Sequence, residues 1–280
     1  MFLFDTHTHF DIPEYDNQRD KYNQSAYDVG VRHLILIGIL AKYFPQMVKT
    51  KIDADNHYPI KHHLACGLHP LYINEHDDND LIILDDYLKK FNNIAIGEIG
   101  LDTYPKQLKS DTLYKKQIGF FIEQIHLSKH YDLPILLHIR KSHADVLKLL
   151  KEQKYRADNQ GGIAHSFSGG ENEALAFVKM GFKIGITGQI TNPNAKKYRH
   201  AIKSVYDKFG ISAFVIETDC PDMMPLPAQM EGNYFNEPKH LIHVLNELSA
   251  MFNMDKALLA HQIWQNTNTA LKSNFAYPIH

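Results

Sequence analysis

The segment Pro134-Ile135-Leu136-Leu137-His138-Ile139-Arg140 is the clearest indication of the fold. Its apolar residues follow one another instead of alternating with polar ones, and Leu34-Ile35-Leu36-Ile37 repeats the pattern. Such runs are typical of strands covered on both faces, as in parallel sheets. In residues 134–140 the run is broken only towards its C-terminal end, where a histidine and an arginine stand.

The same type of apolar run recurs along the chain and is each time followed by an amphipathic stretch. Residues 111–131, for example, place their apolar side chains at helical spacing. The expected strands are residues 2–9, 31–39, 63–69, 94–101, 134–140, 162–168, 183–189 and 213–219.

Eight strands alternating with helices favour an α/β fold of the TIM-type (β/α)₈ barrel class. No glycine-rich dinucleotide fingerprint follows the first strand, which argues against an open doubly wound sheet. A loop at 221–237 and helices at 238–252 and 255–272 complete the expected order, and we expect residues 1–280 to form one domain.

Composition narrows the functional classes. The chain has 280 residues, 44% of them hydrophobic, with 30 basic against 32 acidic side chains, so no broad basic face for a nucleic-acid duplex is expected. There is neither a signal-peptide pattern nor an apolar run of about 20 residues. Two cysteines, Cys66 and Cys220, make no disulfide framework. We therefore expect a cytoplasmic protein with no membrane association and no obligate protein partner.

Polar residues mark the C-terminal ends of the expected strands, where the active sites of such barrels lie. They are His7, His9, His69, Glu98, Asp102, His138, Arg140, His165 and Asp219. One such residue means little, but a ring of them is hard to obtain by chance.

The first strand presents His7 and His9 on one side, because alternate side chains of a strand share a face. Paired imidazoles can bind a divalent metal, or can be a surface pair at a strand edge. Asp5 either orients one of these imidazoles or is an ordinary acid of the strand. Glu98 stands among isoleucines, where a carboxylate needs a metal or a basic partner such as Lys or Arg.

His138 and His165 occupy matching positions at the ends of the fifth and sixth strands, although each alone could be a core histidine. Asp219 ends the eighth strand and can both bind a metal and accept a proton from water. The six metal candidates are therefore His7, His9, Glu98, His138, His165 and Asp219, a set suited to two divalent ions such as Zn²⁺, Mn²⁺ or Mg²⁺.

Three further candidates, His69, Arg140 and Lys141, are indicated less clearly by the sequence. His69 is either a donor to a substrate oxygen or a loop histidine, and Arg140 with Lys141 either binds a phosphate or begins a solvated helix. Cys220 has no base assigned to it, which disfavours thiol chemistry. Trp264 is expected in the core. Six other histidines are expected to be structural or on the surface: His33, His57, His62, His63, His126 and His130.

The chain resembles the TatD-type metal-dependent hydrolases of the amidohydrolase superfamily. The matching segments run in the family's order across nearly the whole chain: 5–10, 66–70, 95–102, 137–140, 164–169, 217–221, 236–238 and 268–269. The resemblance implies that His7, His9, Glu98 and Asp219 hold one metal, with Glu98 bridging to a second held by His138 and His165. It also implies hydrolysis of phosphodiesters, as a deoxyribonuclease acting on DNA ends.

One departure from the family pattern concerns the substrate. Members commonly carry a basic residue just before the Asn236-Glu237-Pro238 stretch, where this chain has Gly232-Asn233-Tyr234-Phe235.

The expected mechanism has a metal-activated water as nucleophile, Asp219 as proton acceptor, and His69 and Arg140 as phosphate ligands. Two alternatives remain: hydrolysis of a small amide, ester or lactone, and a barrel that binds metal without catalysis.

Overall fold

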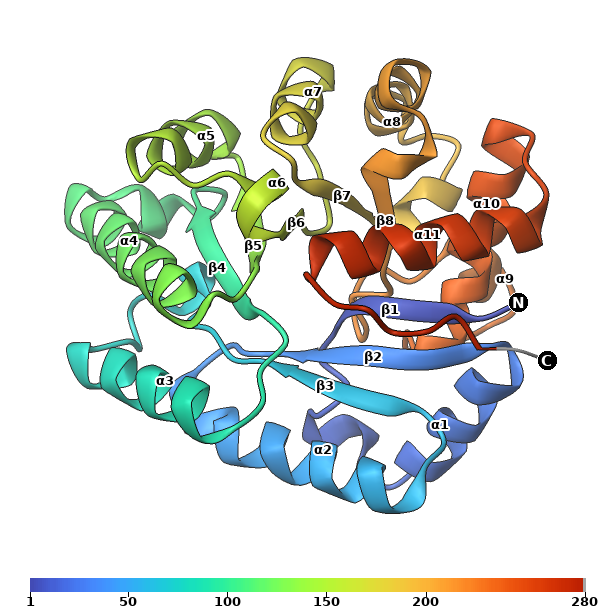
Figure 1. Ribbon diagram of the computed structural model, residues 1–280, viewed down its shortest axis with the longest axis horizontal. Coiled ribbons are helices and arrows are strands. Elements are labelled where there is room, and N and C mark those ends of the chain that lie inside the picture. Colours follow the sequence, from blue (N-terminus) through green and yellow to red (C-terminus); the bar gives the residue numbers. More distant parts are fainter. Residues whose placement is uncertain (279–280) are drawn as a thin grey trace.

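A computed structural model describes residues 1–278 of the chain (Figure 1). In this part of the chain, parallel strands form a three-stranded sheet and a five-stranded sheet, ordered β1-β2-β3 and β4-β5-β6-β7-β8. The strands are β1 (Leu3–Thr8), β2 (Val31–Ile37), β3 (Lys61–Ala65), β4 (Ile96–Asp102), β5 (Ile135–Arg140), β6 (Gly162–Ala164), β7 (Lys183–Ile186) and β8 (Phe214–Ile216).

Backbone hydrogen bonds just outside the regular strands join the two sheets into a closed barrel. Between β3 and β4, the amide of Ile94 donates to Leu64 O at 2.8 Å. Between β8 and β1, the amide of Asp219 donates to His7 O and that of His9 to Cys220 O, both at 2.9 Å. The expected (β/α)₈ barrel is confirmed, and residues of the expected site make the bonds that close it.

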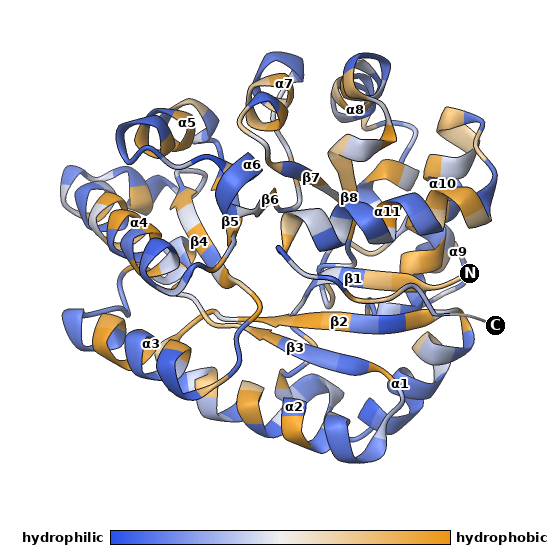
Figure 2. Ribbon diagram, in the orientation of Figure 1, coloured by the Kyte–Doolittle hydropathy of each residue, from blue (hydrophilic) through white to orange (hydrophobic). Residues whose placement is uncertain are grey.

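Helices surround the barrel (Figure 1). Figure 2 shows bands of hydrophobic and hydrophilic residues on them, whereas β2 is hydrophobic along the half that leads to its C-terminal end. None of the helices within residues 1–278 has the length and apolar character needed to cross a membrane. The helices are α1 (Arg19–Asp28), α2 (Phe44–His57), α3 (Asp78–Lys90), α4 (Asp111–Tyr131), α5 (His143–Glu152), α6 (Ala157–Gln160), α7 (Glu171–Lys179), α8 (Lys196–Phe209), α9 (Leu226–Met230), α10 (Leu241–Phe252) and α11 (Lys256–Ala270).

Three glycines let the backbones of β2, β3 and β4 converge next to the site. A Cβ on Gly67 would lie 2.5 Å from the carbonyl carbon of Gly97, and one on Gly38 would lie 2.4 Å from the amide of Gly67. Because these positions carry no side chain, the amide of Glu98 can donate to Gly38 O at 3.1 Å. The contact fixes the backbone from which the Glu98 side chain projects.

The opposite, N-terminal end of the barrel is filled by aromatic side chains. Trp264 of α11 is buried, as expected, and its ring centroid lies 5.7 Å from that of Phe4 on β1. The Trp264 indole donates to Phe275 O at 2.9 Å, so the segment after α11 packs over the same end. Figure 1 shows α11 and this segment crossing the barrel mouth.

Several expected strands are too long at their C-terminal ends. The expectation of 162–168 and 213–219 is wrong beyond Ala164 and Ile216, where β6 and β8 end. The physical reason is that Ser166 and Asp219 have φ of 39° and 55°, values that take the chain out of the extended conformation. His165 and Asp219 therefore lie just after their strands rather than in them.

Candidate metal centre

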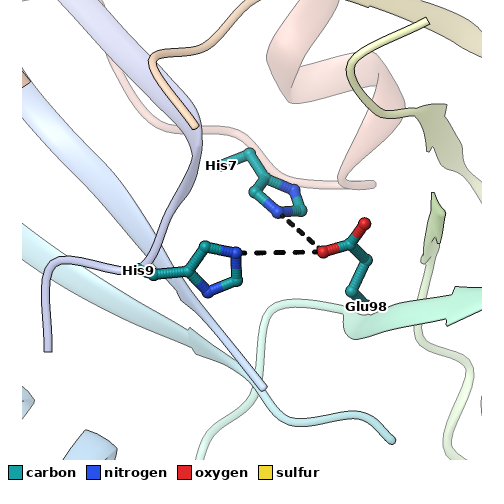
Figure 3. A group of neighbouring side chains, drawn as sticks. All are labelled: His7, His9 and Glu98. Carbon is teal, nitrogen blue, oxygen red and sulfur yellow. Dashed lines mark ion pairs between the residues drawn. The ribbon is translucent and has the colours of Figure 1, made fainter. Parts of the chain in front are cut away.

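A single buried carboxylate, Glu98, lies at the centre of the candidate site and is 1% exposed. Its Oε2 lies 3.2 Å from His7 Nε2 and 3.9 Å from His9 Nε2, so both imidazoles of the first strand end point at one oxygen (Figure 3). His69 Nε2 lies 3.3 Å from the same oxygen.

The other oxygen of Glu98 faces the fifth and sixth strand ends. Oε1 lies 2.5 Å from His138 Nδ1 and 3.7 Å from His165 Nε2. The two oxygens therefore divide the predicted imidazoles into a pair on β1 and a pair on β5 and β6. Such a division suits a carboxylate shared between two cations.

Asp219 is the second carboxylate of the cluster and lies across from Glu98. Its Oδ1 is 3.8 Å from both His7 Nε2 and His9 Nε2, and its Oδ2 is 3.5 Å from His165 Nε2. All six metal candidates from the sequence therefore come together at one end of the barrel.

The spacing of these atoms fits divalent cations. Ligand atoms about 2.1 Å from a tetrahedral ion lie roughly 3.4 Å from one another. The groups His7, His9 and Glu98, and His7, His165 and Asp219, offer ligand atoms that all lie within 4.8 Å of one another. Within residues 1–278, the buried Nε2 of His7 has no hydrogen-bond partner although two carboxylates face it. A cation between them would satisfy these atoms.

The electrostatics of the cluster keep its central carboxylate ionised. Burial alone would raise the pKa of Glu98, but His69, His165, His138 and His7 hold it well below its ordinary value. Burial lowers the pKa of His138, yet the charges of Glu98 and Asp102 outweigh that effect and raise it to about 9. The carboxylates and imidazoles of the site therefore stabilise one another's charges.

Two carboxylates outside the predicted ligand set hold the far sides of the imidazoles. Asp102 Oδ2 lies 3.0 Å from His138 Nε2, and Glu217 Oε1 lies 2.9 Å from His165 Nδ1. Glu217 accepts one hydrogen bond from Thr6 Oγ1, at 3.0 Å, and another from the amide of Ser166, at 2.6 Å. Glu217 was missed from the sequence, although a second acid two residues before Asp219 was a signal for it.

The interpretation of Asp5 as a partner that orients an imidazole is wrong. Asp5 is fully buried and accepts hydrogen bonds from the Thr218 amide and hydroxyl, at 2.9 and 2.6 Å, and from the amide of His7 at 3.3 Å. Burial raises the pKa of Asp5 to about 8. These hydrogen bonds link β1 to the segment after β8. Asp5 therefore positions the backbone of these two segments and contacts no imidazole through them.

His69 is arranged as a hydrogen-bond donor. Its Nδ1 accepts from the amide of Leu71 at 3.0 Å, so in the neutral ring the proton is on Nε2, which points into the site. Burial lowers the pKa of His69 to about 4, which keeps the ring neutral. This geometry favours donation to an oxygen over metal binding.

A cavity of about 410 Å³ lies over the cluster. Arg140 forms part of its wall, and its guanidinium lies 3.9 Å above the ring of Tyr104. The cavity is lined by His9, His69, Leu71, Glu98, His138, Ile139, Arg140, His165, Ser166, Ser168, Asp219, Asp222 and Met223. The three residues predicted to be catalytic thus face the same space as five of the six predicted ligands.

The remaining histidines lie away from this cavity. His33 Nδ1 lies 2.8 Å from His63 Nε2 next to the aromatic cluster of Phe4, and buried His62 contacts Asn23 at 2.9 Å. His57, His126 and His130 are exposed. Cys66 and Cys220 are buried free thiols whose pKa values are raised by burial, which is unfavourable for nucleophilic chemistry.

The segment that departs from the family pattern packs against the first βα loop. The rings of Phe235 and Tyr15 lie 4.9 Å apart, and Tyr15 donates to Asn236 O at 2.7 Å. Asn236 in turn donates to Thr218 O and Asp222 O, at 3.0 and 2.6 Å. These bonds support the turn that carries Asp219.

Comparisons with known proteins agree with this arrangement. The family described as TatD related DNase matches residues 4–272. An uncharacterized metal-dependent hydrolase of Haemophilus influenzae is 33% identical over 270 residues, covering 95% of this chain and 98% of the relative. The uncharacterized metal-dependent hydrolase YjjV of Escherichia coli is 34% identical over 248 residues, covering 88% and 90%.

A solved structure is similar along almost the whole chain. The crystal structure of YjjV, a TatD homolog from Escherichia coli, has a TM-score of 0.82 at 31% identity and covers 97% of this chain and 98% of its own. Both the family match and these relatives span the strands that carry the imidazole and carboxylate cluster. The chain therefore belongs to the TatD family of metal-dependent hydrolases.

Proposed function

We propose that this protein hydrolyses phosphodiester bonds at DNA ends with the help of two divalent cations. The proposal rests on how the imidazoles are arranged around the two oxygens of Glu98. His7 and His9 face Oε2, whereas His138 and His165 face Oε1. One shared carboxylate between two imidazole pairs is the arrangement that a pair of adjacent cations needs.

Cations held there supply a water of lowered pKa, near 7, and neutralise charge on the phosphoryl oxygens. His7, His9, Glu98 and Asp219 would hold one cation, and Glu98, His138 and His165 would hold the other. Zn²⁺, Mn²⁺ and Mg²⁺ are the ions to be tested, because a mixed nitrogen and oxygen set selects weakly among them.

The protein's own groups then have separate tasks. Asp219 faces the cavity and accepts the proton that leaves the attacking water. His69, with its proton on Nε2, donates to a phosphoryl oxygen. Asp102 and Glu217 hold the rings of His138 and His165 in place from behind.

Arg140 supports an anionic substrate rather than a lactone or amide. Its guanidinium lines the cavity and, within residues 1–278, its side chain has no ion-pair partner. A planar guanidinium resting on the ring of Tyr104 presents its edge to a phosphate, which it can bind with two parallel hydrogen bonds. Arg140→Ala is expected to raise KM for a phosphodiester by about 10-fold or more.

The test combines metal analysis with substrate comparison. The purified protein should bind two ions per chain, and His138→Ala should leave one. Bis(p-nitrophenyl) phosphate and single-stranded and duplex DNA ends should be hydrolysed, whereas a panel of lactones and amides should not. Turnover of lactones without turnover of phosphodiesters would refute the substrate class, and bound metal with no hydrolysis of any kind would favour a non-catalytic barrel.

A further inference from the structure

A second cavity, of about 430 Å³, adjoins the cavity over the metal cluster. The two share Arg140 and Ser168 in their walls, so a ligand can extend from one into the other. The second cavity lies between the ends of β4, β5 and β6 and the start of α8. It is lined by Tyr104, Arg140, Lys141, Ser142, His143, Ala144, Asp145, Ser168, Gly169, Glu173 and Lys197.

The charges around this cavity favour an anion. Three cations, Arg140, Lys141 and Lys197, line it against two carboxylates. In the part of the chain that the structure describes, no ion pair is formed by either lysine. Both carboxylates are already engaged: Asp145 accepts from Tyr114 Oη and Glu173 from the amide of Gly170, each at 2.6 Å.

A buried imidazole without a hydrogen-bond partner lies in the wall of the same cavity. His143 is 6% exposed, and across residues 1–278 its Nε2 makes no hydrogen bond. Leaving a buried polar atom unpaired costs about 1–3 kcal/mol, which favours a small shift of the ring that brings Nε2 to a ligand oxygen in the cavity. A Cβ on Gly169 would lie 2.8 Å from His143 Cδ2, so glycine leaves this edge of the ring free of a side chain.

The first turn of α5 adds backbone donors at the same place. Ser142 precedes the helix, but its hydroxyl donates to Leu101 O at 2.6 Å and makes no side-chain cap. The first amides of a helix then remain available, and the helix dipole favours negative charge beside them. Lysines, an unpaired imidazole and an uncapped helix start thus converge on one cavity.

We propose that this second cavity binds the phosphate next to the scissile one in a single strand of nucleic acid. The inference rests on the proposed function and deepens it, because it makes the preferred substrate a chain with at least two phosphodiester groups. Two adjoining small cavities suit one strand at its end, whereas a chain of net charge −2 offers no wide basic face for a duplex. Arg140 would contact both phosphates from the shared wall.

The test is the salt dependence of binding by the double variant K141A/K197A. A fluorescein-labelled oligothymidylate with phosphorothioate linkages, which resist hydrolysis, is titrated with the metal-loaded protein and followed by anisotropy. Each lost phosphate contact to a single strand lowers the slope of log Kd against log salt by about 0.7. Both lysines face one phosphate, so the slope should fall by about 0.7, which weakens binding on the order of 10-fold at about 50 mM salt and little near 1 M.

Two controls distinguish the loss of a phosphate contact in the second cavity from a general loss of positive charge. K208A removes an exposed lysine at the far end of α8 and should change neither slope nor affinity. The KM of the double variant for bis(p-nitrophenyl) phosphate, which has only one phosphodiester group, should stay within about twofold of the native value.

The outcomes are distinguishable from failure of the proposed function. An unchanged salt slope, or an equal loss for the oligonucleotide and the small phosphodiester, would overturn the second phosphate site. Weaker binding of inorganic phosphate alone, with unchanged oligonucleotide binding, would overturn its assignment to a nucleic-acid strand. A lysine-dependent slope in a protein that hydrolyses no phosphodiester would instead preserve the binding site and remove the proposed reaction.

Discussion

Glu98 is surrounded by five imidazoles because a carboxylate cannot be buried among apolar strands without compensation. His7, His9 and His69 approach one of its oxygens; His138 and His165 approach the other. That the six metal candidates lie together could be predicted from the sequence because strand ends of one barrel meet at one rim. Glu217 was missed although an acid two residues before Asp219 was a signal for it, because its contact with His165 depends on the left-handed turn at Ser166, whose amide donates to Glu217.

Asp219→Asn tests the proton acceptor. Asparagine tolerates the positive φ of this position, so the fold should be retained, while its amide cannot accept the proton of the attacking water. We expect kcat to fall by about 10²- to 10⁴-fold at saturating metal. Initial rates on bis(p-nitrophenyl) phosphate are the measurement, with thermal unfolding and metal content as controls. Near-native kcat at full metal occupancy would exclude Asp219 as the base.

Glu217→Gln tests whether the second carboxylate acts through His165. Glutamine can retain the oxygen that accepts from the Ser166 amide, but an NH2 group replaces the oxygen that accepts from Thr6, and the charge beside His165 Nδ1 is lost, so the imidazole becomes a weaker ligand. Metal affinity should fall about 10- to 100-fold. Competition with a chromophoric chelator measures it. The matched control is Glu247→Gln, whose glutamate pairs with Arg199 outside the cavity and should leave metal affinity unchanged.

Among the elements, the apolar runs predicted every strand but not where each one ends. The prediction for β5 is right to within one residue, and β2 ends with its apolar run at Ile37, two residues before the predicted end. β6 and β8 are shorter than predicted because Ser166 and Asp219 turn left-handed, a conformation that neither residue type announces in a sequence. The ends of β3 and β7 were also predicted too far along the chain, at residues 69 and 189 instead of Ala65 and Ile186, so the misplaced ends include more than those that present His165 and Asp219.

Gly67→Ala tests the close approach of β3 and β4. The added Cβ would lie 2.5 Å from the carbonyl carbon of Gly97 and 2.9 Å from the amide of Glu98, both backbone atoms that cannot move aside cheaply. The free energy of unfolding should fall by about 1–3 kcal/mol. Urea denaturation measures it, and metal affinity should fall too because Glu98 is displaced.

A second glycine provides the control with the opposite sign. Gly119 lies exposed on α4 and nothing lies within 4 Å of its added Cβ, so Gly119→Ala should raise the free energy of unfolding by up to about 1 kcal/mol. If Gly67→Ala were as stable as this control, the strand contact would not constrain the barrel.

In the molecule as a whole, the barrel separates chemistry from stability along its axis. The C-terminal mouth collects charged and polar groups that compensate one another, and the N-terminal mouth is filled by Phe4, Trp264 and the segment that carries Phe275. The sequence predicted Trp264 as a core residue but not its partners, because contacts between the first strand and the end of the chain leave no local pattern.

Ending the chain at Lys272 tests this separation. The change removes the half-buried rings of Phe275 and Tyr277, together with the hydrogen bond from the Phe2 amide to Tyr277 Oη. Loss of this apolar burial should lower the free energy of unfolding by about 2 kcal/mol. Trp264 is the only tryptophan, so a red shift of the intrinsic fluorescence reports its exposure directly. Since the metal cluster lies at the opposite end of the barrel, the truncated chain should bind as many ions as the native protein, and loss of metal from it would mean that the two ends of the barrel are coupled.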